Sequence, residues 1–161
     1  IIQISKHIKR SESIKSQVGT RNGIKNMPGS GDIKNLGNVA YEILEPVRAK
    51  FEKPVMINSG FRCLELNRKI GGSDSSQHTK GMAVDFEIIG TPNIQVAYWI
   101  QNNCDFDQLI LEFFKPDEDN AGWIHASYCD GNNRKQVLTF DGKSYSDGLP
   151  EMEWKDGKVK S

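Results

Sequence analysis

The longest stretch of helical hydrophobic spacing begins in the first third of the chain. Apolar residues there recur at every third or fourth position: Ile33, Leu36, Val39, Ala40, Ile43, Leu44 and Val47. This pattern predicts a helix over residues 33–48 with Asp32 as its N-cap. Pro46 lacks a backbone N–H group, so we expect the helix to kink or restart there. Similar spacing predicts a second helix over residues 92–102 and a shorter one over 64–70.

A strictly alternating pattern occupies residues 83–89. Val84 and Phe86 fall on an apolar face of the extended chain, whereas Asp85 and Glu87 fall on a polar one. This pattern predicts a strand buried on one side only. Apolar runs bounded by turn residues predict three further strands and an edge strand, over residues 54–58, 107–114, 123–128 and 137–140. The polar loop between the second and third of these runs predicts a hairpin.

The order of these elements predicts an α+β fold in a single domain. At 161 residues, the chain is long enough to bury one core. We expect residues 1–31 to form an irregular, lightly helical N-terminal cover and residues 146–161 to form a polar C-terminal tail. We also expect the two longer helices to pack on one face of a small antiparallel sheet, whose strands lie near Val55, Val84, Ile110 and Ile124.

Composition and charge exclude several classes of protein. The 21 Lys and Arg residues equal the 21 Asp and Glu residues in number, so no overall field attracts nucleic acid or an anionic membrane. No apolar run approaches the roughly 20 residues of a spanning helix, and we expect a monomer that does not insert into membranes. The cysteines are odd in number and have no Cys-x-x-Cys spacing, which favours small buried side chains in a reduced protein: Cys63, Cys104 and Cys129.

Two histidines and an aspartate are spaced so that one metal ion could bind all three. His78 lies in a polar loop, Asp85 lies on the polar face of the next strand, and His125 lies on a later strand. Hydrolytic zinc sites use three ligands of these types and leave a fourth position for water. Gly81 and Ala83 are small enough to leave room for the ion. The set predicts one Zn²⁺ on the sheet face opposite the helices.

The hairpin suggests a catalytic base for this site. If its loop is centred between Glu118 and Asp119, Glu112 lies directly opposite His125. Directly opposed side chains have Cβ atoms about 4.5 to 5.5 Å apart. The carboxylate could then take a proton from water at the metal as a general base. A slip of one residue would turn Glu112 to the other face of the sheet.

Each of these residues also has a more ordinary interpretation. A loop histidine usually forms surface hydrogen bonds, and a strand glutamate often faces solvent. Asp85 could form a metal-free ion pair with Lys80 or Arg62. The agreement of three ligand types, a candidate base and small residues on one site favours a metal. His7 lacks a comparable setting, and we interpret it as structural.

A set of short motifs resembles the M15 family of zinc peptidases. The motifs are Ser59-Gly-Phe-Arg62, Leu66-Asn67, Gly71-Gly72-Ser73, Ser76-Gln-His78, Gly81-x-Ala83-x-Asp85 and Trp123-Ile-His125. The similarity is greatest to the D-Ala-D-Ala carboxypeptidase-like, phage endolysin-like branch, and it extends from about Ser5 to about Tyr145. Three further segments also resemble this branch: Gly23-Ile-x-Asn26-x-Pro28, Leu44-Glu-Pro-Val-Arg48 and Asp107-Gln-Leu-Ile-x-Glu112-Phe.

The resemblance implies a hedgehog/D-Ala-D-Ala peptidase-like fold and one zinc ion held by three side chains, those of His78, Asp85 and His125. It implies that Arg62 binds the substrate carboxylate or stabilises the oxyanion, a role that its planar, permanently charged group suits. It also implies that Ser76 lines the substrate site.

The chain departs from the wider family at the position of the base. Several members of that family have a glutamate three residues before the last histidine, where this chain has Gly122. Glu112 matches the pattern of the closer branch and is therefore the preferred base, and Glu87 is the second candidate. Cys63 stands where the branch often has serine, which we interpret as a packing change.

The function that the resemblance implies is zinc-dependent hydrolysis of an amide bond in peptidoglycan stem peptides. The enzyme would be a D-Ala-D-Ala carboxypeptidase or an L-Ala-D-Glu endopeptidase. The alternative is a non-catalytic M15-like binding module or phage structural domain, and the presence of Glu112 favours catalysis. The first ten residues show no secretory signal, which would suit a phage lysin made in the host cytoplasm and acting on the cell wall.

Overall fold

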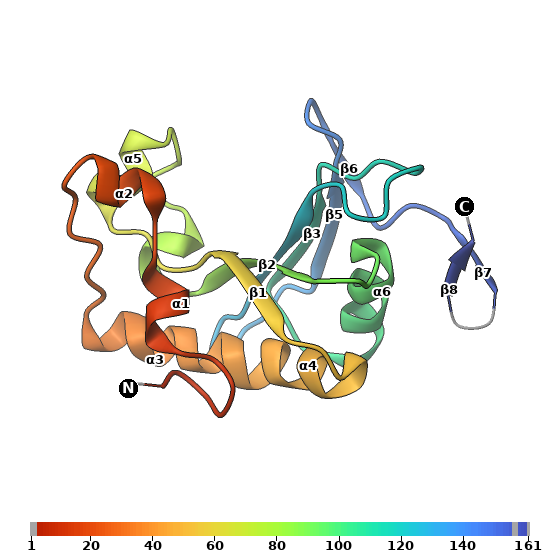
Figure 1. The fold of residues 1–161 in the computed structure, drawn as a ribbon, viewed down its shortest axis with the longest axis horizontal. Helices are drawn as coiled ribbons and strands as arrows, with labels where there is room; N and C mark the ends of the chain where they lie inside the picture. Colours follow the sequence, from red (N-terminus) through yellow and green to blue (C-terminus); the bar gives the residue numbers. More distant parts are fainter. Residues whose placement is uncertain (1–2, 156–157, 161) are drawn as a thin grey trace.

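A six-stranded sheet runs through the centre of the structure, a computed structural model that describes residues 3–155 and 158–160 (Figure 1). Its strands lie in the order β1-β2-β4-β3-β5-β6. Their bounds are Val55–Ser59 (β1), Ala83–Ile88 (β2), Trp123–Ser127 (β4), Gln108–Glu112 (β3), Gln136–Phe140 (β5) and Tyr145–Asp147 (β6). The predicted α+β class is confirmed, and each of the five predicted strands is present. The predicted edge strand, β5, is not at the edge, because β6 pairs with its outer side.

One pair of strands corrects the prediction of a purely antiparallel sheet. β3 and β5 are parallel, whereas the other neighbouring pairs in this sheet are antiparallel. After β4 the chain reverses and crosses the end of β3. The N–H groups of Lys135 and Gln136 donate to the carbonyls of Phe106 and Asp107 at 3.1 and 3.0 Å. These bonds fix β5 on the far edge of β3, in the same direction as β3.

The predicted long helix is present as three consecutive segments. They are α3 (Ser30–Val39), a π-helical turn (Ala40–Leu44) and α4 (Glu45–Phe51). The N-cap is Gly29 and not Asp32, whose carboxylate instead accepts a hydrogen bond from the Gly29 N–H group at 2.8 Å. The π-helical turn ends directly before the first turn of α4, where Pro46 has no N–H group to donate. The helix thus restarts near the proline, as predicted.

The core contains residues of these helices and of the sheet. α6 (Asn93–Asn103) contacts β2, β3 and β4, and α3 contacts β2. Alternation along the strands buries Val84, Phe86 and Ile124 in the same apolar cluster as the helices. The same alternation places Asp85 and His125 on the opposite face. The apolar and polar patterns in the sequence therefore separate the packing face from the polar one.

The N-terminal region contains two short helices, α1 (Arg10–Ile14) and α2 (Gln17–Arg21), as the predicted lightly helical segment suggests. His7 lies beside α4, where its Nδ1 atom is 2.6 Å from Glu45 Oε1. Burial raises the pKa of Glu45, but hydrogen bonds from Ser5 and His7 outweigh burial and lower it. The first two residues of the predicted cover lie outside the described residues.

The C-terminal region has more structure than the sequence pattern predicted. β6 extends the main sheet, and β7 (Glu153–Lys155) pairs with β8 (Lys158–Lys160) in a separate two-stranded sheet (Figure 1). Residues 156–157 and 161 of the predicted polar tail lie outside the described part of the chain. Within that part, every helix is too short or too polar to cross a bilayer.

All three cysteines are free. Cys104 is buried, and burial raises the pKa of its thiol to about 11. Cys63 and Cys129 are half-buried, so the prediction of buried side chains holds only for Cys104.

Candidate metal centre

His78 lies on a 3₁₀ turn, η2 (Gln77–Lys80), and is 3% exposed. Its Nδ1 atom is 2.8 Å from the carbonyl oxygen of Gly60. This bond orients the ring with Nδ1 as the donor and leaves Nε2, which lies 3.3 Å from Asp85 Oδ1, as the atom that can bind a metal. Gly81 closes the turn with φ +71°, and a Cβ atom there would collide with the carbonyl oxygen of Asp32.

Asp85 and His125 face each other directly across β2 and β4. Asp85 Oδ1 is 2.9 Å from His125 Nδ1 and 3.3 Å from His78 Nε2. One ligand atom from each of the three residues lies within 4.8 Å of the other two. Ligand atoms about 2.0 to 2.2 Å from a tetrahedral ion lie about 3.3 to 3.6 Å from one another. The donor types therefore suit a zinc ion, and the two distances to Asp85 are close to this spacing.

The electrostatics of this cluster favour an ionised carboxylate. Burial raises the pKa of Asp85, but hydrogen bonds from His125 and His78 outweigh it and hold the pKa well below its ordinary value. Asp85 is thus a carboxylate, the form that binds metal, at neutral pH. Its ion-pair partners within the described residues are the two histidines. The expected alternative, a pair with Lys80 or Arg62, is not formed.

The position of Glu112 corrects the predicted hairpin register. Ile110 lies opposite His125, and Glu112 lies opposite Trp123, so the loop is centred one residue earlier than expected. β3 ends at Glu112 because Phe113 adopts a left-handed conformation with φ +54°. The pairing differs by two residues, so Glu112 remains on the same face of the sheet as His125. The face was predicted correctly and the partner was not.

Glu112 interacts electrostatically with the cluster from this diagonal position. Burial raises its pKa, and the negative charge of Asp85 raises it further, while His125 and Arg62 act in the opposite direction. A carboxylate with a raised pKa is a better proton acceptor than an ordinary surface glutamate. The position and the pKa of Glu112 both suit a general base.

Arg62 projects from the loop that follows β1. Its N–H group donates to the carbonyl of His78 at 3.0 Å, which ties the arginine loop to the η2 turn. Nη1 donates to Ser59 Oγ at 3.2 Å, whereas the buried Nε atom has no partner. Burial lowers the pKa of Arg62, and the carboxylates of Asp85 and Glu112 oppose that shift. The guanidinium stays charged at neutral pH.

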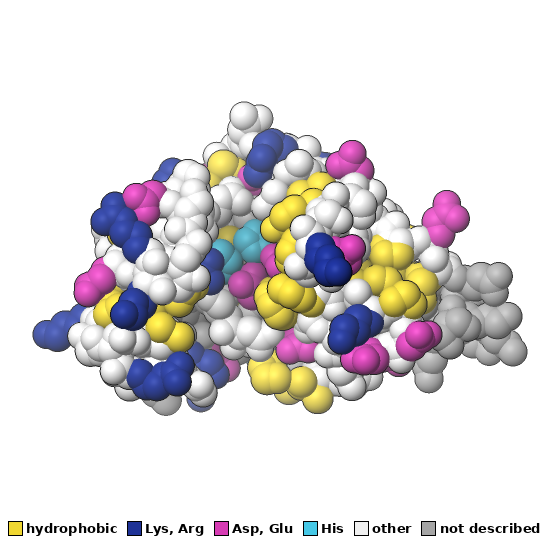
Figure 2. All heavy atoms as spheres, turned by 90° about the horizontal axis from the view of Figure 1, so that it is seen from above, with side chains coloured by type: hydrophobic (Ala, Val, Ile, Leu, Met, Phe, Trp, Pro, Cys, Tyr) yellow, Lys and Arg dark blue, Asp and Glu magenta, His cyan; other side chains and the backbone are white. Residues whose placement is uncertain are grey.

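The cluster lies at the bottom of a hollow in the surface. Figure 2 shows histidine and acidic side chains there, between two raised parts of the molecule. Lys and Arg side chains are numerous on the left part, and hydrophobic side chains border the hollow on the right. Asp85 and His125 line hollows at the surface, so a peptide could approach the candidate centre from solvent.

A protein-family model described as Peptidase M15 matches residues 6–125, most of the 161 residues of the chain. The chain belongs to the M15 peptidase family. M15 peptidases are zinc peptidases, and the His78, Asp85 and His125 group is a candidate site for that metal. A comparison with curated proteins gave no match. The match to the family ends at His125, so β5 to β8 lie beyond it.

The other residues expected at the M15 site lie close to the cluster. Ser76 caps η2, and its Oγ atom accepts a hydrogen bond from the His78 N–H group at 3.3 Å. Glu87 lies two residues after Asp85 on the same face of β2 and accepts a hydrogen bond from Asn58 at 3.1 Å. Both residues therefore border the centre without belonging to the ligand group.

Sequence reasoning missed a charged network beside this M15 site. Arg134 donates to both carboxylate oxygens of Asp107, and Gln77 donates to Asp107 Oδ2 at 2.8 Å. Asp107 and Arg134 are separated by a strand, a hairpin and a second strand. No periodicity or motif linked them, because only the parallel pairing of β3 and β5 brings them together.

Proposed function

We propose that this M15 chain is a zinc-dependent peptidase that hydrolyses an amide bond in peptidoglycan stem peptides. The observation that carries the proposal is the approach of His78, Asp85 and His125 to one another, with Asp85 and His125 in the walls of two surface hollows. Cleavage of D-Ala-D-Ala and cleavage of L-Ala-D-Glu are the two candidate reactions. A phage endolysin of the D-Ala-D-Ala carboxypeptidase-like branch is the setting that the sequence motifs favour.

His78, Asp85 and His125 would hold a zinc ion, which would supply Lewis-acid chemistry at the scissile bond. Glu112 takes the proton from the attacking water and passes it to the leaving nitrogen. Its half-buried position and raised pKa support this role. Glu87 is the second candidate, and its hydrogen bond to Asn58 makes it the weaker one.

Arg62 and Ser76 act on the substrate. Arg62 stabilises the negative charge that develops on the carbonyl oxygen, or binds a substrate carboxylate. Its unpartnered buried Nε atom supports a role in binding an oxygen. Ser76 lines the substrate site beside His78 and at the same time holds the turn that carries this histidine.

We also propose how the domain is organised around the zinc site. We take residues 1–161 as a single M15-like domain that acts as a monomer, with a hedgehog/D-Ala-D-Ala peptidase-like fold. The helices would cover one face of the sheet and the zinc would bind on the other. The alternation along β2 and β4 supports this arrangement.

Mass spectrometry of purified peptidoglycan fragments tests the proposed function. Zinc-loaded wild type should release new peptide fragments. Glu112→Gln should reduce the rate by at least about 100-fold, because general base catalysis is lost. Glu118→Gln is the matched control, since this carboxylate is exposed in the hairpin loop.

Two outcomes would change the account. If zinc-loaded wild type cleaves nothing, the chain is not a cell-wall peptidase, and the non-catalytic binding module takes its place. If Glu112→Gln cleaves as fast as wild type, the peptidase remains and Glu112 is not its base.

A further inference from the structure

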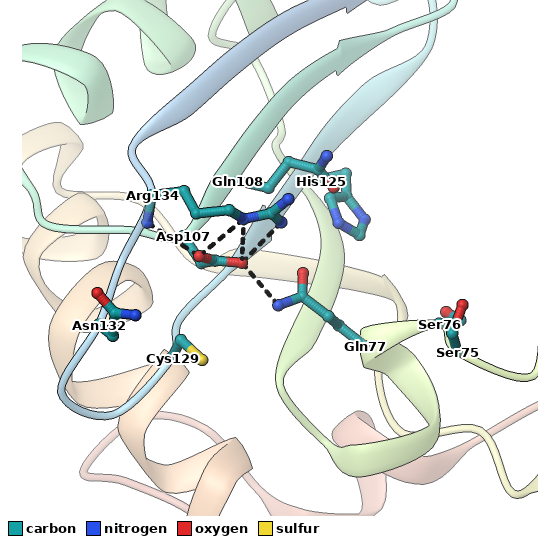
Figure 3. Close-up of a pocket in the computed structure, with 9 residues that line it drawn as sticks. All are labelled: Ser75, Ser76, Gln77, Asp107, Gln108, His125, Cys129, Asn132 and Arg134. Carbon is teal, nitrogen blue, oxygen red and sulfur yellow. Dashed lines mark hydrogen bonds and ion pairs between the residues drawn. The ribbon is translucent and has the colours of Figure 1, made fainter.

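Two separate hollows meet at the candidate metal centre. The first, the Arg134 hollow, has a volume of about 490 Å³ and includes His125 in its wall (Figure 3). The second, the α2 hollow, has a volume of about 1030 Å³ and includes Asp85. Asp85 and His125 are in contact at 2.9 Å. The α2 hollow therefore reaches the candidate metal centre at Asp85, and the Arg134 hollow reaches it at His125. Space for substrate therefore exists on two sides of the centre.

The Arg134 hollow offers mainly neutral hydrogen-bonding groups. Figure 3 shows the Arg134 guanidinium above Asp107, which it binds through both carboxylate oxygens. This pairing lowers the pKa of Asp107 and leaves little net charge at the base of the hollow. Serine and amide side chains, including Ser75 and Asn132, line the rest. The lining suits the backbone and the small side chains of a peptide.

The α2 hollow differs because cationic groups line it. Lys15, the C-cap of α1, and Arg21, the last residue of α2, are exposed and line this hollow together with Arg62. Lys15 and Arg21 have no ion-pair partner among the residues that the structure describes. Asp85 and Glu87 also line this hollow, so its three cationic side chains outnumber its two carboxylates. The charge on this wall is thus available to an anionic substrate group.

Two unpartnered donors belong to the same hollow. Arg62 Nε and Trp123 Nε1 are buried without a hydrogen-bond partner, and both side chains line the α2 hollow. Buried donors without partners are uncommon and unfavourable in folded proteins. A ligand rich in acceptor oxygens would compensate for them. The unpaired cations and the orphaned donors therefore indicate the same ligand chemistry.

We propose that one peptide chain passes through both hollows, so that the protein cuts an internal bond, and that Lys15 and Arg21 bind a carboxylate of the peptide in the α2 hollow. This inference rests on the proposed peptidase function and selects the endopeptidase form of it. A carboxypeptidase needs space for only a terminal residue on one side of the bond. Here both sides are open for longer segments.

The reaction at an internal bond is ordinary amide hydrolysis. Water adds to the carbonyl carbon, the C–N bond breaks, and the leaving nitrogen takes a proton. The products are a peptide with a new carboxylate and a peptide with a new amine. In this setting Arg62 stabilises the oxyanion, because no terminal carboxylate is required for binding.

Capped peptides test whether the cut is internal. Zinc-loaded wild type is incubated with a stem pentapeptide that has free ends and with the same peptide acetylated and amidated. The endopeptidase should cleave both with kcat/KM values within about threefold, because neither charged chain end takes part in the contacts proposed for the two hollows. Cleavage of the free peptide alone, with release of its last residue, would overturn the inference and leave the peptidase function intact. Cleavage of neither peptide would remove both.

Variants that fill the hollows provide a second test. Thr20→Trp narrows the α2 hollow and Asn132→Trp narrows the Arg134 hollow, and both residues are exposed. Each should raise the Kd of the Glu112→Gln protein for the capped peptide by about tenfold. Asn102→Trp, on an exposed position of α6, is the control. If only one of these two variants raised the Kd, the peptide would not cross both hollows, and the inference would be overturned.

Charge variants test the carboxylate. Two capped peptides are compared that differ only by amidation of their acidic residue. Lys15→Gln combined with Arg21→Gln should lower kcat/KM about tenfold on the acidic peptide, mainly through KM, and leave the amidated peptide unchanged. Lys25→Gln combined with Lys34→Gln is the matched control. Equal losses on the two peptides, or no loss on either, would overturn the assignment of Lys15 and Arg21.

Discussion

The two sides of the candidate metal centre are held in place by different means. His78 and Arg62 lie on loops and a single 3₁₀ turn, which we call the loop side (residues 59–63 and 76–81). Asp85 and His125 lie within adjacent strands, which we call the sheet side (β2, β3 and β4). Repeated ladder bonds support each residue of the sheet side. A few individual bonds and close contacts support the loop side.

Those few contacts are concentrated on residues 60 to 63. Gly60 O holds the His78 ring, Phe61 N–H donates to Ser13 O at 2.8 Å, and Arg62 N–H donates to His78 O. Asn26 bonds to the residues on both sides of Arg62, through Phe61 O and Cys63 N–H at 2.8 Å each. One ligand and the arginine therefore depend on the same short segment. Damage to it should affect metal binding and substrate binding together.

Gly60→Ala should have the largest effect on the loop side. A Cβ atom at this position would collide with the carbonyl oxygen of Ser13, so the segment has to move. We expect a loss of about 3 kcal/mol in the free energy of unfolding, together with weaker zinc binding. Urea denaturation and zinc titration measure the two quantities.

Gly31→Ala is the matched control for this prediction. A Cβ atom there meets nothing within 4 Å, and the residue lies in α3. Alanine should stabilise the protein by about 0.5 to 1 kcal/mol. If the two glycine variants behave alike, the close contact at Gly60 does not support the loop side.

Asn26→Ala should have the second largest effect. The side chain makes three hydrogen bonds to backbone groups, including one to Ile14 O at 2.7 Å. Their loss leaves partly buried groups without partners, and we expect a cost of about 2 to 3 kcal/mol in unfolding free energy. Asn35→Ala removes one exposed bond, to Lys80 O, and should cost less than about 1 kcal/mol. Chemical denaturation measures both free energies of unfolding. If the two variants lost the same amount, the three hydrogen bonds of Asn26 would not stabilise the loop side.

Asp107→Asn should have a smaller effect that depends on pH. Hydrogen bonds from Arg134 lower the pKa of Asp107 more than burial raises it, and Gln77 adds to the lowering. A carboxyl group with a depressed folded pKa stabilises the protein above its unfolded pKa of about 3.9, and this stability is lost as the pH falls through the folded value. The variant should lose about 1 to 3 kcal/mol at pH 7 and much less near pH 2. Denaturation at both pH values measures the difference, and a loss independent of pH would contradict the ionised pair.

Hydrophobic patterns in the sequence predict the sheet side better than the loop side. The spacing of Ile33 to Val47 and the alternation around Asp85 report burial on one face, and burial determines helices and strands. The same reasoning placed Asp85, His125 and Glu112 on one face. The exact partner of Glu112 depended on Phe113, a non-glycine residue with positive φ that no turn motif announces.

The hollows could not be predicted for a related reason. Their walls combine α2, η2 and the segment before β5, and only the tertiary structure brings these together. The sequence pattern does not indicate the parallel pairing of β3 and β5. The short strands β6 to β8 have weak or no apolar alternation. The candidate metal ligands could be proposed from the sequence because their types and spacing carry chemical information. In the sequence, Lys15, Arg21 and Arg134 look like ordinary surface charges.

The zinc content of the purified protein tests the central claim most directly. Elemental analysis after dialysis should find one zinc ion per chain in wild type. His78→Ala, from the loop side, and Asp85→Ala, from the sheet side, should each lose it, because three protein ligands are needed to hold the ion. His7→Ala, which alters the histidine beside Glu45, should keep it. Wild type without zinc, or zinc retained in both ligand variants, would contradict a metal centre built from His78, Asp85 and His125.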